Sequence, residues 1–397
     1  MPVERLLPTQ DARDLLALAV EIADKEMGTR VETHERSELY PEGLFGVLAE
    51  AGLLGLAYPE EWGGGGQPYE VYLQVLEEFA ARWAAVAVAV SVHTLATHPM
   101  AAFGSQMQKQ RWLSNMTAGQ IIGGYSLSEP QAGSDAAALV CKAVPTDAGY
   151  RITGTKSWIT NGGRADFYAL FARTGEGTKG ISCFLGPGWA NGLSFGRPEQ
   201  KMGLHAIPTT AAFYDGVDID TDRLIGAEGQ GLEIAFSALD AGRLGIAAIA
   251  TGLAQAALDH AVEYANERTT FGRKIIDHQG LGFLLADMAA AVDSARATYL
   301  DAARRRDAEL SYSRNASVAK LVCTDAAMKV TTDAVQVLGG YGYTRDFPVE
   351  RYMREAKIMQ IFEGTNQIQR LVISRHLAKS PRATATSEER ARNTSEQ

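Results

Sequence analysis

Cysteine is scarce in this chain. Its 397 residues include three, Cys141, Cys183 and Cys323, and no two of them lie close together in the sequence. That spacing is unlike the paired cysteines of a zinc site, and three cysteines argue against a disulfide framework. We therefore expect no metal site, and a protein that resides in the reducing cytoplasm.

Positive charge and long apolar runs are also in short supply. The formal net charge is −9, which gives no electrostatic support for a nucleic-acid partner. The main basic cluster, Arg304 to Arg306, is interpreted as a solvated helix face. The longest apolar run, residues 83–90, is too short to cross a bilayer, and no basic stretch with an apolar core opens the chain. We expect no nucleic-acid binding, no membrane insertion and no signal peptide.

The glycine pattern of a Rossmann fold is missing as well. No Gly-x-Gly-x-x-Gly follows an expected strand. Four consecutive glycines, residues 63–66, have neither a strand before them nor a Lys-Ser/Thr pair after them. They are interpreted as a flexible turn rather than a phosphate loop. A dinucleotide bound by this chain would need another binding mode.

What the chain does contain changes in character at two points. The length predicts two or three domains, and 46% hydrophobic with 21% charged residues is ordinary for a globular protein. Helical spacing dominates residues 1–122 and returns over residues 232–378, whereas residues 123–231 are rich in Gly, Thr and β-branched or aromatic residues. Residues 379–397 are polar and are expected to form a disordered tail.

The expected fold is α+β and multidomain, with an N-terminal α-helical domain, a middle β-sheet or β-barrel domain, and a C-terminal antiparallel helical bundle. The apolar run 167–172 predicts a strand buried on both faces. Helices are expected at 41–51, 69–92, 94–116, 232–266, 280–306 and 313–338, with Pro348 opening another and Asn366 with Gln369 spaced to cap the last. This domain order suggests a site in a cleft between domains.

One heptapeptide, Ile361-Phe362-Glu363-Gly364-Thr365-Asn366-Gln367, places a single carboxylate among apolar residues and a glycine. A carboxylate shielded from water has a raised pKa and a higher basicity. A base that removes a proton from carbon needs such basicity. The alternative is a surface Glu at a helix–helix turn, which is the commoner case for an arbitrary Glu.

Two further clusters could face a ligand ring. In residues 125–135, small hydroxyl residues and a glycine let the backbone approach a ligand and offer donors. In residues 156–162, Trp158 beside Thr160 combines a flat apolar face with a hydroxyl donor, which suits a planar heteroaromatic cofactor. The structural alternatives are a hydrogen-bonded turn for the first cluster and a core Trp for the second.

Three more clusters carry charges or exposed backbone. Asp240 and Arg243 share one helix face, which is also common in surface ion pairs. Residues 268–279 and 336–342 offer cations, an amide donor and glycines that expose backbone N–H groups, and such groups hold phosphates. Each of these signals is weak alone.

Taken together and in this order, the motifs resemble those of the acyl-CoA dehydrogenases, flavin enzymes that introduce a double bond between Cα and Cβ of acyl-CoA thioesters. The resemblance extends from about Pro41 to Leu377, because five separated signatures agree in order and spacing. It implies an N-terminal helical domain, a middle β-barrel and a C-terminal four-helix bundle. It also implies a homotetramer, with FAD held in extended form and a neighbouring subunit completing its site.

The resemblance assigns roles residue by residue. Glu363 is similar to the catalytic base. The residues similar to flavin contacts are Tyr125, Leu127, Ser128, Gly133, Ser134, Trp158, Ile159 and Thr160. Those similar to contacts with the rest of FAD are Arg268, Thr270, Phe271, His278, Gln279, Gln336, Val337, Leu338, Gly339, Gly340, Thr365 and Gln367. Those similar to acyl-CoA contacts are Ser134, Asp240, Arg243 and Gly364.

The implied reaction is α,β-dehydrogenation of an acyl-CoA to a trans-2-enoyl-CoA. Glu363 would take the α-proton while the β-hydrogen leaves as hydride to flavin N5, and an electron-transferring flavoprotein would receive the electrons, as in fatty acid β-oxidation. Branches of the isovaleryl type carry the base at the position of Gly242. Glycine there, in the sequence Asp-Ala-Gly-Arg, is most similar to short-chain and short-branched-chain members.

Two rivals use the same fold and give electrons to oxygen: an acyl-CoA oxidase and a flavin monooxygenase. Peroxisomal oxidases are usually much longer than this chain, and monooxygenases on this fold usually lack the base. No residue settles oxygen reactivity. A rival from another class is a non-catalytic helical scaffold, which would be colourless and indifferent to acyl-CoA.

Overall fold

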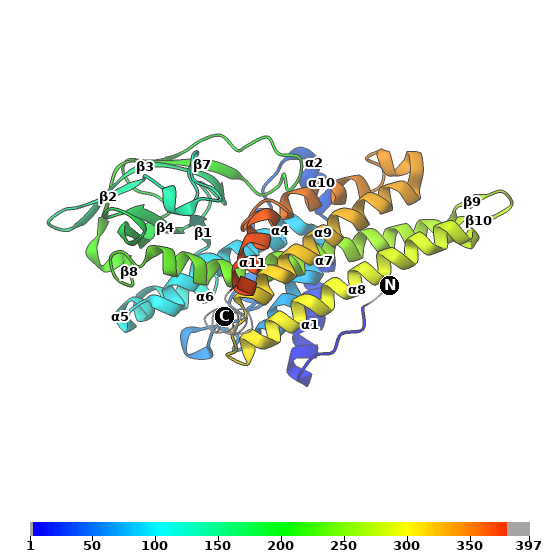
Figure 1. The fold of residues 1–397 in the computed structure, drawn as a ribbon, viewed down its shortest axis with the longest axis horizontal. Coiled ribbons are helices and arrows are strands. Elements are labelled where there is room, and N and C mark those ends of the chain that lie inside the picture. The colour runs from blue at the N-terminus through cyan, green and yellow to red at the C-terminus, as the bar shows by residue number, and fades with distance from the viewer. Residues whose placement is uncertain (1–2, 379–397) are drawn as a thin grey trace, which may run out of the picture.

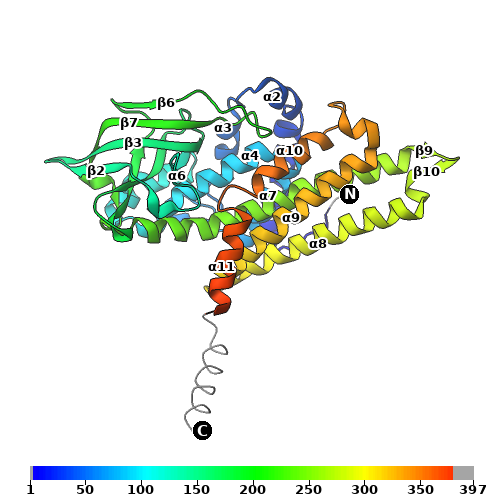
Figure 2. The ribbon, with the colours of Figure 1, turned by 45° about the horizontal axis from the view of Figure 1, so that its top comes forward.

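The computed structural model describes residues 3–378, and the expected tail at 379–397 lies outside the described residues. Helices, a β-sheet and a long helical bundle follow one another along the chain (Figure 1). The N-terminal helices pack on the C-terminal ones in a single hydrophobic core, and the sheet lies at one end of the bundle (Figure 2). The order of helical, β and helical domains expected from the sequence is confirmed.

The N-terminal helices differ from the prediction at one point. They are α1 (Gln10–Ile22), α2 (Val31–Ser37), α3 (Leu44–Glu50), α4 (Tyr69–Phe103), α5 (Gln106–Gln108) and α6 (Ser114–Thr117), with π-helical turns at Ala23–Gly28 and Lys109–Leu113. The predicted break at residue 93 is wrong, because α4 kinks at Trp83 and ends before Gly104. Thr94 Oγ1 donates to Val90 O, so this polar side chain is satisfied within the helix and does not end it.

The glycine run 63–66 forms a turn, as expected, and backbone hydrogen bonds hold it. The N–H of Gly64 donates to Pro59 O, and that of Gly66 donates to Tyr58 O. A Cβ on Gly64 would lie 2.2 Å from Tyr58 O. The glycines are therefore explained by close backbone packing.

The middle of the chain forms one eight-stranded sheet. Its strands are β1 (Gly123–Ser126), β2 (Lys142–Pro145), β3 (Gly149–Thr160), β4 (Phe167–Arg173), β5 (Ile181–Pro187), β6 (Leu193–Phe195), β7 (Thr209–Asp220) and β8 (Leu224–Ile225). Hydrogen bonds join them in the order β6-β7-β3-β2-β4-β5-β8, and β1 pairs in parallel with β4. Within the described residues this path does not return from β8 to β6, so the barrel takes the form of an open sheet.

Strand β4 separates two hydrophobic cores. Phe167, Ala169 and Phe171 pack with α4 and α7 residues in one core, while Tyr168 and Leu170 join the sheet's own core on the other face. Successive strand side chains point to opposite faces, so both sets must be apolar. The continuous apolar run in the sequence is thereby explained, and the prediction of a strand buried on both faces is confirmed.

The C-terminal helices agree closely with the predicted ranges. They are α7 (Gly231–Glu267), α8 (Gln279–Asp307), α9 (Ser313–Leu338), α10 (Val349–Met359) and α11 (Asn366–Ala378), and the short hairpin β9 (Thr269–Thr270) and β10 (Arg273–Lys274) joins α7 to α8. One cap is wrong: Thr365 Oγ1, not the side chain of Asn366, accepts the N–H of Ile368 at the start of α11. The Asn366 amide is turned away to donate to Thr324 and Asp325.

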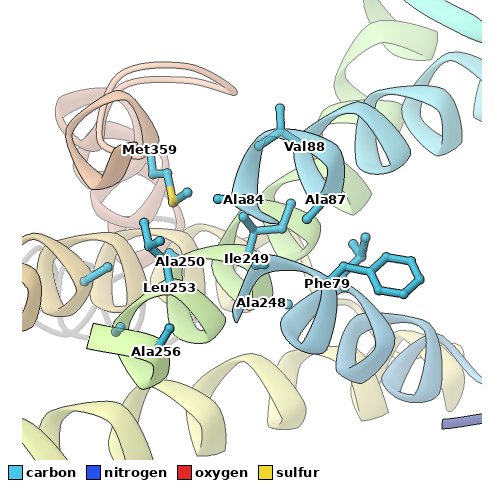
Figure 3. Packing of buried hydrophobic residues seen from close by; sticks show 14 of the residues in the cluster. Phe79, Ala84, Ala87, Val88, Ala248, Ile249, Ala250, Leu253, Ala256 and Met359 are labelled. Carbon is cyan, nitrogen blue, oxygen red and sulfur yellow. The ribbon is translucent and has the colours of Figure 1, made fainter. Parts of the chain in front are cut away.

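Helices α4 and α7 cross at the centre of the core through small residues (Figure 3). Ala84 and Ala87 of α4 lie close to Ala248 and Ile249 of α7 in this view. A Cβ on Gly252 would lie only 2.1 Å from Glu77 O, so the two backbones nearly touch. By length and hydropathy both helices could span a membrane, but 89% and 78% of their apolar windows are buried inside the protein, as in core helices.

Replacement of Gly252 by Ala should destabilise the protein. The added methyl group has no room against the α4 backbone, and overpacking of this kind costs about 1–3 kcal/mol. Denaturant unfolding of the full-length protein measures the change. Gly46→Ala is the matched control, because Gly46 is also helical and a Cβ there meets nothing within 4 Å. Equal stability of the two variants would contradict the close crossing.

Candidate active site

Glu363 lies in a strained turn between α10 and α11. Its φ is 53° and that of Gly364 is 87°, so both residues are left-handed. For a residue with a side chain this conformation costs about 1–2 kcal/mol. Gln369 Nε2 donates to Gly364 O at 2.8 Å and to Glu363 O at 3.3 Å, and Lys320 Nζ donates to Gly364 O at 2.9 Å. Side chains from α9 and α11 therefore hold the turn in place.

The carboxyl group of Glu363 lies against helix α7. A Cβ added to Gly242 would be 2.9 Å from Glu363 Oε2 and 3.0 Å from Leu95 Cδ1. Oε2 is buried and has no hydrogen-bond partner among the described residues. Burial raises the pKa of Glu363 to about 7, against the opposing positive charges of Arg243 and Lys320. A buried, unpaired carboxyl that ionises near neutral pH can act as a general base.

Two of the predicted acyl-CoA contacts lie on α7 beside this carboxyl. Arg243 donates to Asp240 Oδ1 at 2.5 Å, yet its Nε atom is buried without a partner among the described residues. Burial also raises the pKa of Asp240 above its ordinary value. Gly364 adjoins Glu363, whereas Ser134 is exposed on the loop between β1 and β2. A polar ligand beside α7 could satisfy the free Arg243 N–H.

The two predicted flavin segments are joined by a buried lysine. Lys156 Nζ donates to Leu127 O at 2.9 Å and to Glu129 Oε1 at 2.8 Å. The N–H of Ser157 donates to Ser128 O at 2.9 Å. The structure therefore brings these segments side by side at the end of the sheet.

The chemistry of these segments fits a planar ring with polar edges. Trp158 has a left-handed φ of 63° and is 63% exposed, so its indole is available to a ligand. The side chains of Asn161 and Thr210 have buried polar atoms without partners in the described part of the chain. Tyr125 donates to Ala235 O at 3.4 Å and so anchors β1 on α7. These residues fit a flavin.

Several of the residues predicted to contact the flavin do not present an exposed side chain to a ligand. Leu127 and Ile159 are buried in the cores on the two faces of the sheet, so their backbone atoms alone face outward. Gly133 lies in an exposed loop where a Cβ would meet nothing within 4 Å. Thr160 is partly buried at the end of β3, next to Asn161.

A cleft of about 500 Å³ lies at the opposite end of the bundle. It is lined by Tyr264, Arg268, Thr270, Ile275, Val337, Leu338, Gly339, Gly340, Tyr341 and Thr344, six of which are predicted FAD contacts. Arg268 and the exposed glycines give it a cation and free backbone, which suits a phosphate-bearing ligand.

Four more residues of this predicted set, Phe271, His278, Gln279 and Gln336, lie on the elements that border the cleft. Phe271 stands at the tip of the β9–β10 hairpin with a left-handed φ of 51°, and it is 96% exposed. His278 Nε2 lies 3.3 Å from Thr270 Oγ1, while Gln279 and Gln336 are exposed. The described residues of a single chain leave the large apolar side chain of Phe271 almost fully exposed.

The two groups of predicted FAD contacts are far apart in one chain. Gly242, beside the base, lies on α7, and Arg268, at the cleft, directly follows its last residue, so 26 residues at 1.5 Å each separate the two by about 39 Å. Figure 1 shows the β9–β10 hairpin and the β-sheet at opposite ends of the molecule. Thr365 and Gln367 lie at the Glu363 end, not at the cleft. One extended dinucleotide cannot reach both groups of the same chain.

A small enclosed cavity adjoins Gly242 on the α4 side. Its volume is about 10 Å³, and it is lined by Ala57, Tyr58, Tyr69, Ser91, Thr94, Leu95, His98, Ala241, Gly242 and Arg306. The interpretation of Arg304 to Arg306 as a solvated face is wrong for Arg306, whose guanidinium carbon lies 3.7 Å from the centre of the Tyr69 ring. Arg306 and the tyrosines thus close the cavity within a short distance of the base.

The sequence reasoning gave no role to Lys156, Lys320 or Arg306. A signal for Lys320 was present, because it continues the small-residue face formed by Ala316, Ala319 and Cys323. A lysine on a buried helix face is rarely placed there without a polar partner.

Residues 9–120, 124–217 and 229–378 match the models of the N-terminal, middle and C-terminal domains of acyl-CoA dehydrogenase. The chain belongs to the acyl-CoA dehydrogenase family. It is 41% identical to an acyl-CoA dehydrogenase of Bacillus subtilis over 93% of this chain and 98% of that protein. It is also 41% identical to a short-chain specific acyl-CoA dehydrogenase of Clostridium acetobutylicum, over 89% and 94%.

Solved structures of the family agree with the fold. Butyryl-CoA dehydrogenase from Megasphaera elsdenii superposes with a TM-score of 0.92 at 37% identity, covering 95% of this chain and all of that one. A chain of the structure described as the electron transferring flavoprotein of Acidaminococcus fermentans gives 0.93 at 40% identity, with the same coverage. The fold and the enzyme class expected from the sequence are confirmed.

Replacement of Gly242 by Ala should slow this acyl-CoA dehydrogenase without unfolding it. The new methyl group would touch Glu363 Oε2 and displace the carboxyl, and a misplacement of about 1 Å costs roughly a hundredfold in rate. Steady-state dehydrogenase assays measure the loss, with Gly46→Ala as the neutral control. Wild-type activity of the Gly242 variant would show that the base does not rest on α7.

Proposed function

We propose that the protein converts a short acyl-CoA thioester to a trans-2-enoyl-CoA, with Glu363 as the base that takes the α-proton. The observation that carries this proposal is Oε2 of Glu363, which is buried beside Gly242 and has no hydrogen-bond partner among the described residues. Bound FAD would supply the acceptor for the β-hydride. The flavin segments and the cleft at Arg268 fit the two ends of this cofactor.

The turn that carries the base also offers an oxyanion donor. The α-proton of a thioester becomes acidic enough to remove when donors stabilise the carbonyl oxygen as negative charge develops there. The backbone N–H of Glu363 has no acceptor among the described residues. It can therefore donate to the thioester oxygen while the side chain of the same residue faces Cα. Oε2 of Glu363 is buried, so water is kept from this side of the carboxyl.

The FAD site of this proposal is shared between two copies of the chain. One copy supplies the base and the flavin segments, and the other supplies Arg268, the exposed Phe271 and residues 336–340. The separation of about 39 Å along α7 supports this arrangement, because one chain cannot hold both ends of one cofactor. The homotetramer that the resemblance implies would provide such pairs.

The short acyl chain is supported by relatives named short-chain specific and by a neighbour named butyryl-CoA dehydrogenase. We further propose an electron-transferring flavoprotein as the electron acceptor, since a similar chain occurs in a structure of that system. A cytoplasmic location and a role in fatty acid β-oxidation complete the proposal.

Anaerobic mixing with butyryl-CoA should reduce the flavin, and the rate should rise with pH through about 7 as Glu363 loses its proton. Glu363→Gln should bind FAD and acyl-CoA normally but reduce the flavin at least ~10²–10⁴-fold more slowly. Stopped-flow absorbance measures both. Near-normal reduction by the Gln variant would rule out the base, and rapid peroxide formation on aeration would indicate an oxidase.

Mixed oligomers test the shared FAD site. Arg268→Glu alone should fail to retain FAD, and Glu363→Gln alone should retain it but stay inactive. Co-expressed with different tags and purified together, the two variants should regain activity, because one site of each mixed pair combines an intact base with an intact Arg268. If FAD binds within one chain, the mixed oligomers stay as inactive as the parents.

A further inference from the structure

A buried lysine lies directly beneath the turn that carries the base. Lys320 is on α9, and its side chain is fully buried. Its Nζ atom donates to Gly364 O and to Asn366 Oδ1, both at 2.9 Å. No carboxylate of the described residues lies within ion-pair distance of it, although a buried ammonium is costly without a paired charge. Packing alone does not explain a charge at this position.

The lysine belongs to a network that binds both ends of the turn. Asn366 Nδ2 donates to Asp325 Oδ1 at 2.7 Å, and Gln360 Nε2 donates to the same atom at 2.7 Å. Gln360 ends α10 and Asn366 begins α11, so α9 holds the residues on either side of the turn. Lys320 is the member of this network that reaches the turn itself, at Gly364. This network therefore holds the left-handed backbone of Glu363 from the side of α9.

The titratable groups that face the Glu363 carboxyl come from three elements. Arg243 on α7 and Lys320 on α9 are positive, and Tyr125 on β1 is neutral because burial raises its pKa far above 10. Asp325 faces Lys320 from α9. Burial lowers the pKa of Lys320 to about 7, while Glu363 opposes that change. Each of the two groups therefore stabilises the charged form of the other.

We propose that Lys320 is a positioning residue for the base: it holds the Glu363–Gly364 turn through Gly364 O and supplies one of the two positive charges that face the Glu363 carboxylate. The proposal rests on the proposed function of Glu363. It extends that function to the residue that sets both the geometry and the charge of the base. Lys320 itself touches neither substrate nor cofactor.

Lys320→Met tests both parts, because Met keeps the length of the side chain and removes the charge and the donor. The pKa of Glu363 should rise by about one unit, as expected when a nearby positive charge is lost, and flavin reduction by butyryl-CoA at pH 7 should fall about tenfold or more. Lys329→Met is the matched control, because Lys329 lies on the same helix but is exposed and pairs with Asp333. It should behave as wild type.

Two measurements on the holoenzymes separate this role from simple destabilisation. The pH profile of flavin reduction reports the base in action. Infrared difference spectra against Glu363→Gln report the protonation of the same carboxyl without substrate. A rise in both pKa values in Lys320→Met supports the proposal. Unchanged values in that variant, whatever its stability, overturn it.

Asn366→Leu separates the two proposed effects of Lys320, which are the positioning of the turn and the positive charge near Glu363. It can also be tested if Lys320→Met does not fold. It removes one anchor of the turn but keeps the lysine charge, so flavin reduction should slow at every pH while the infrared pKa of Glu363 stays at its wild-type value. Wild-type rates in Asn366→Leu would overturn the positioning part. If wild-type protein is reduced by no acyl-CoA, the proposed function fails, whereas the infrared shift in Lys320→Met would still show the coupling.

Discussion

Oε2 of Glu363 is buried without a hydrogen-bond partner in the described part of the chain, and the rest of the site depends on how the protein sustains that condition. An unpaired buried polar group costs about 1–3 kcal/mol, and the left-handed backbone of the same residue costs about 1–2 more. A short loop between two helices could relieve both by flipping outward. It does not do so because α9 and α11 grip the turn through Lys320 and Gln369. The same contacts therefore keep the backbone of Glu363 strained and keep its carboxyl in the buried place that raises its basicity.

The carboxyl of Glu363 packs against helix α7 at Gly242. The middle of α7 crosses α4 so closely that Gly252 has no space for a methyl group, which fixes the helix in position and rotation. That crossing in turn presents Gly242 to Glu363 and places Arg243 beside it. A bulkier or looser crossing would change the distance between the base and α7, so the packing of the distant core controls the chemistry at the site.

Much of the fold was predictable because local pattern and burial agree. The range 313–338 was matched at both ends, and the run 167–172 could only be a strand with two apolar faces. Glu363 was found because its neighbours are apolar. The course of α4 past residue 93 was not predictable, since it depends on Thr94 satisfying its hydroxyl inside the helix. Lys320 gave a sequence signal as a lysine on a small-residue helix face, but its partner was not predictable, because Gly364 lies far along the chain and meets Lys320 only when α9 packs against the turn.

The same long helix explains why one chain cannot complete the proposed FAD site. Any side chain near Glu363 and any side chain near Arg268 are held apart by a nearly straight α7, and no loop movement can shorten a packed helix of 37 residues. Both ends nevertheless carry groups suited to one cofactor. A two-fold pair would resolve this, because an antiparallel neighbour would set its Arg268 end beside the first chain's Glu363 end and create two equal sites. In this arrangement the length of α7 makes assembly a condition of catalysis.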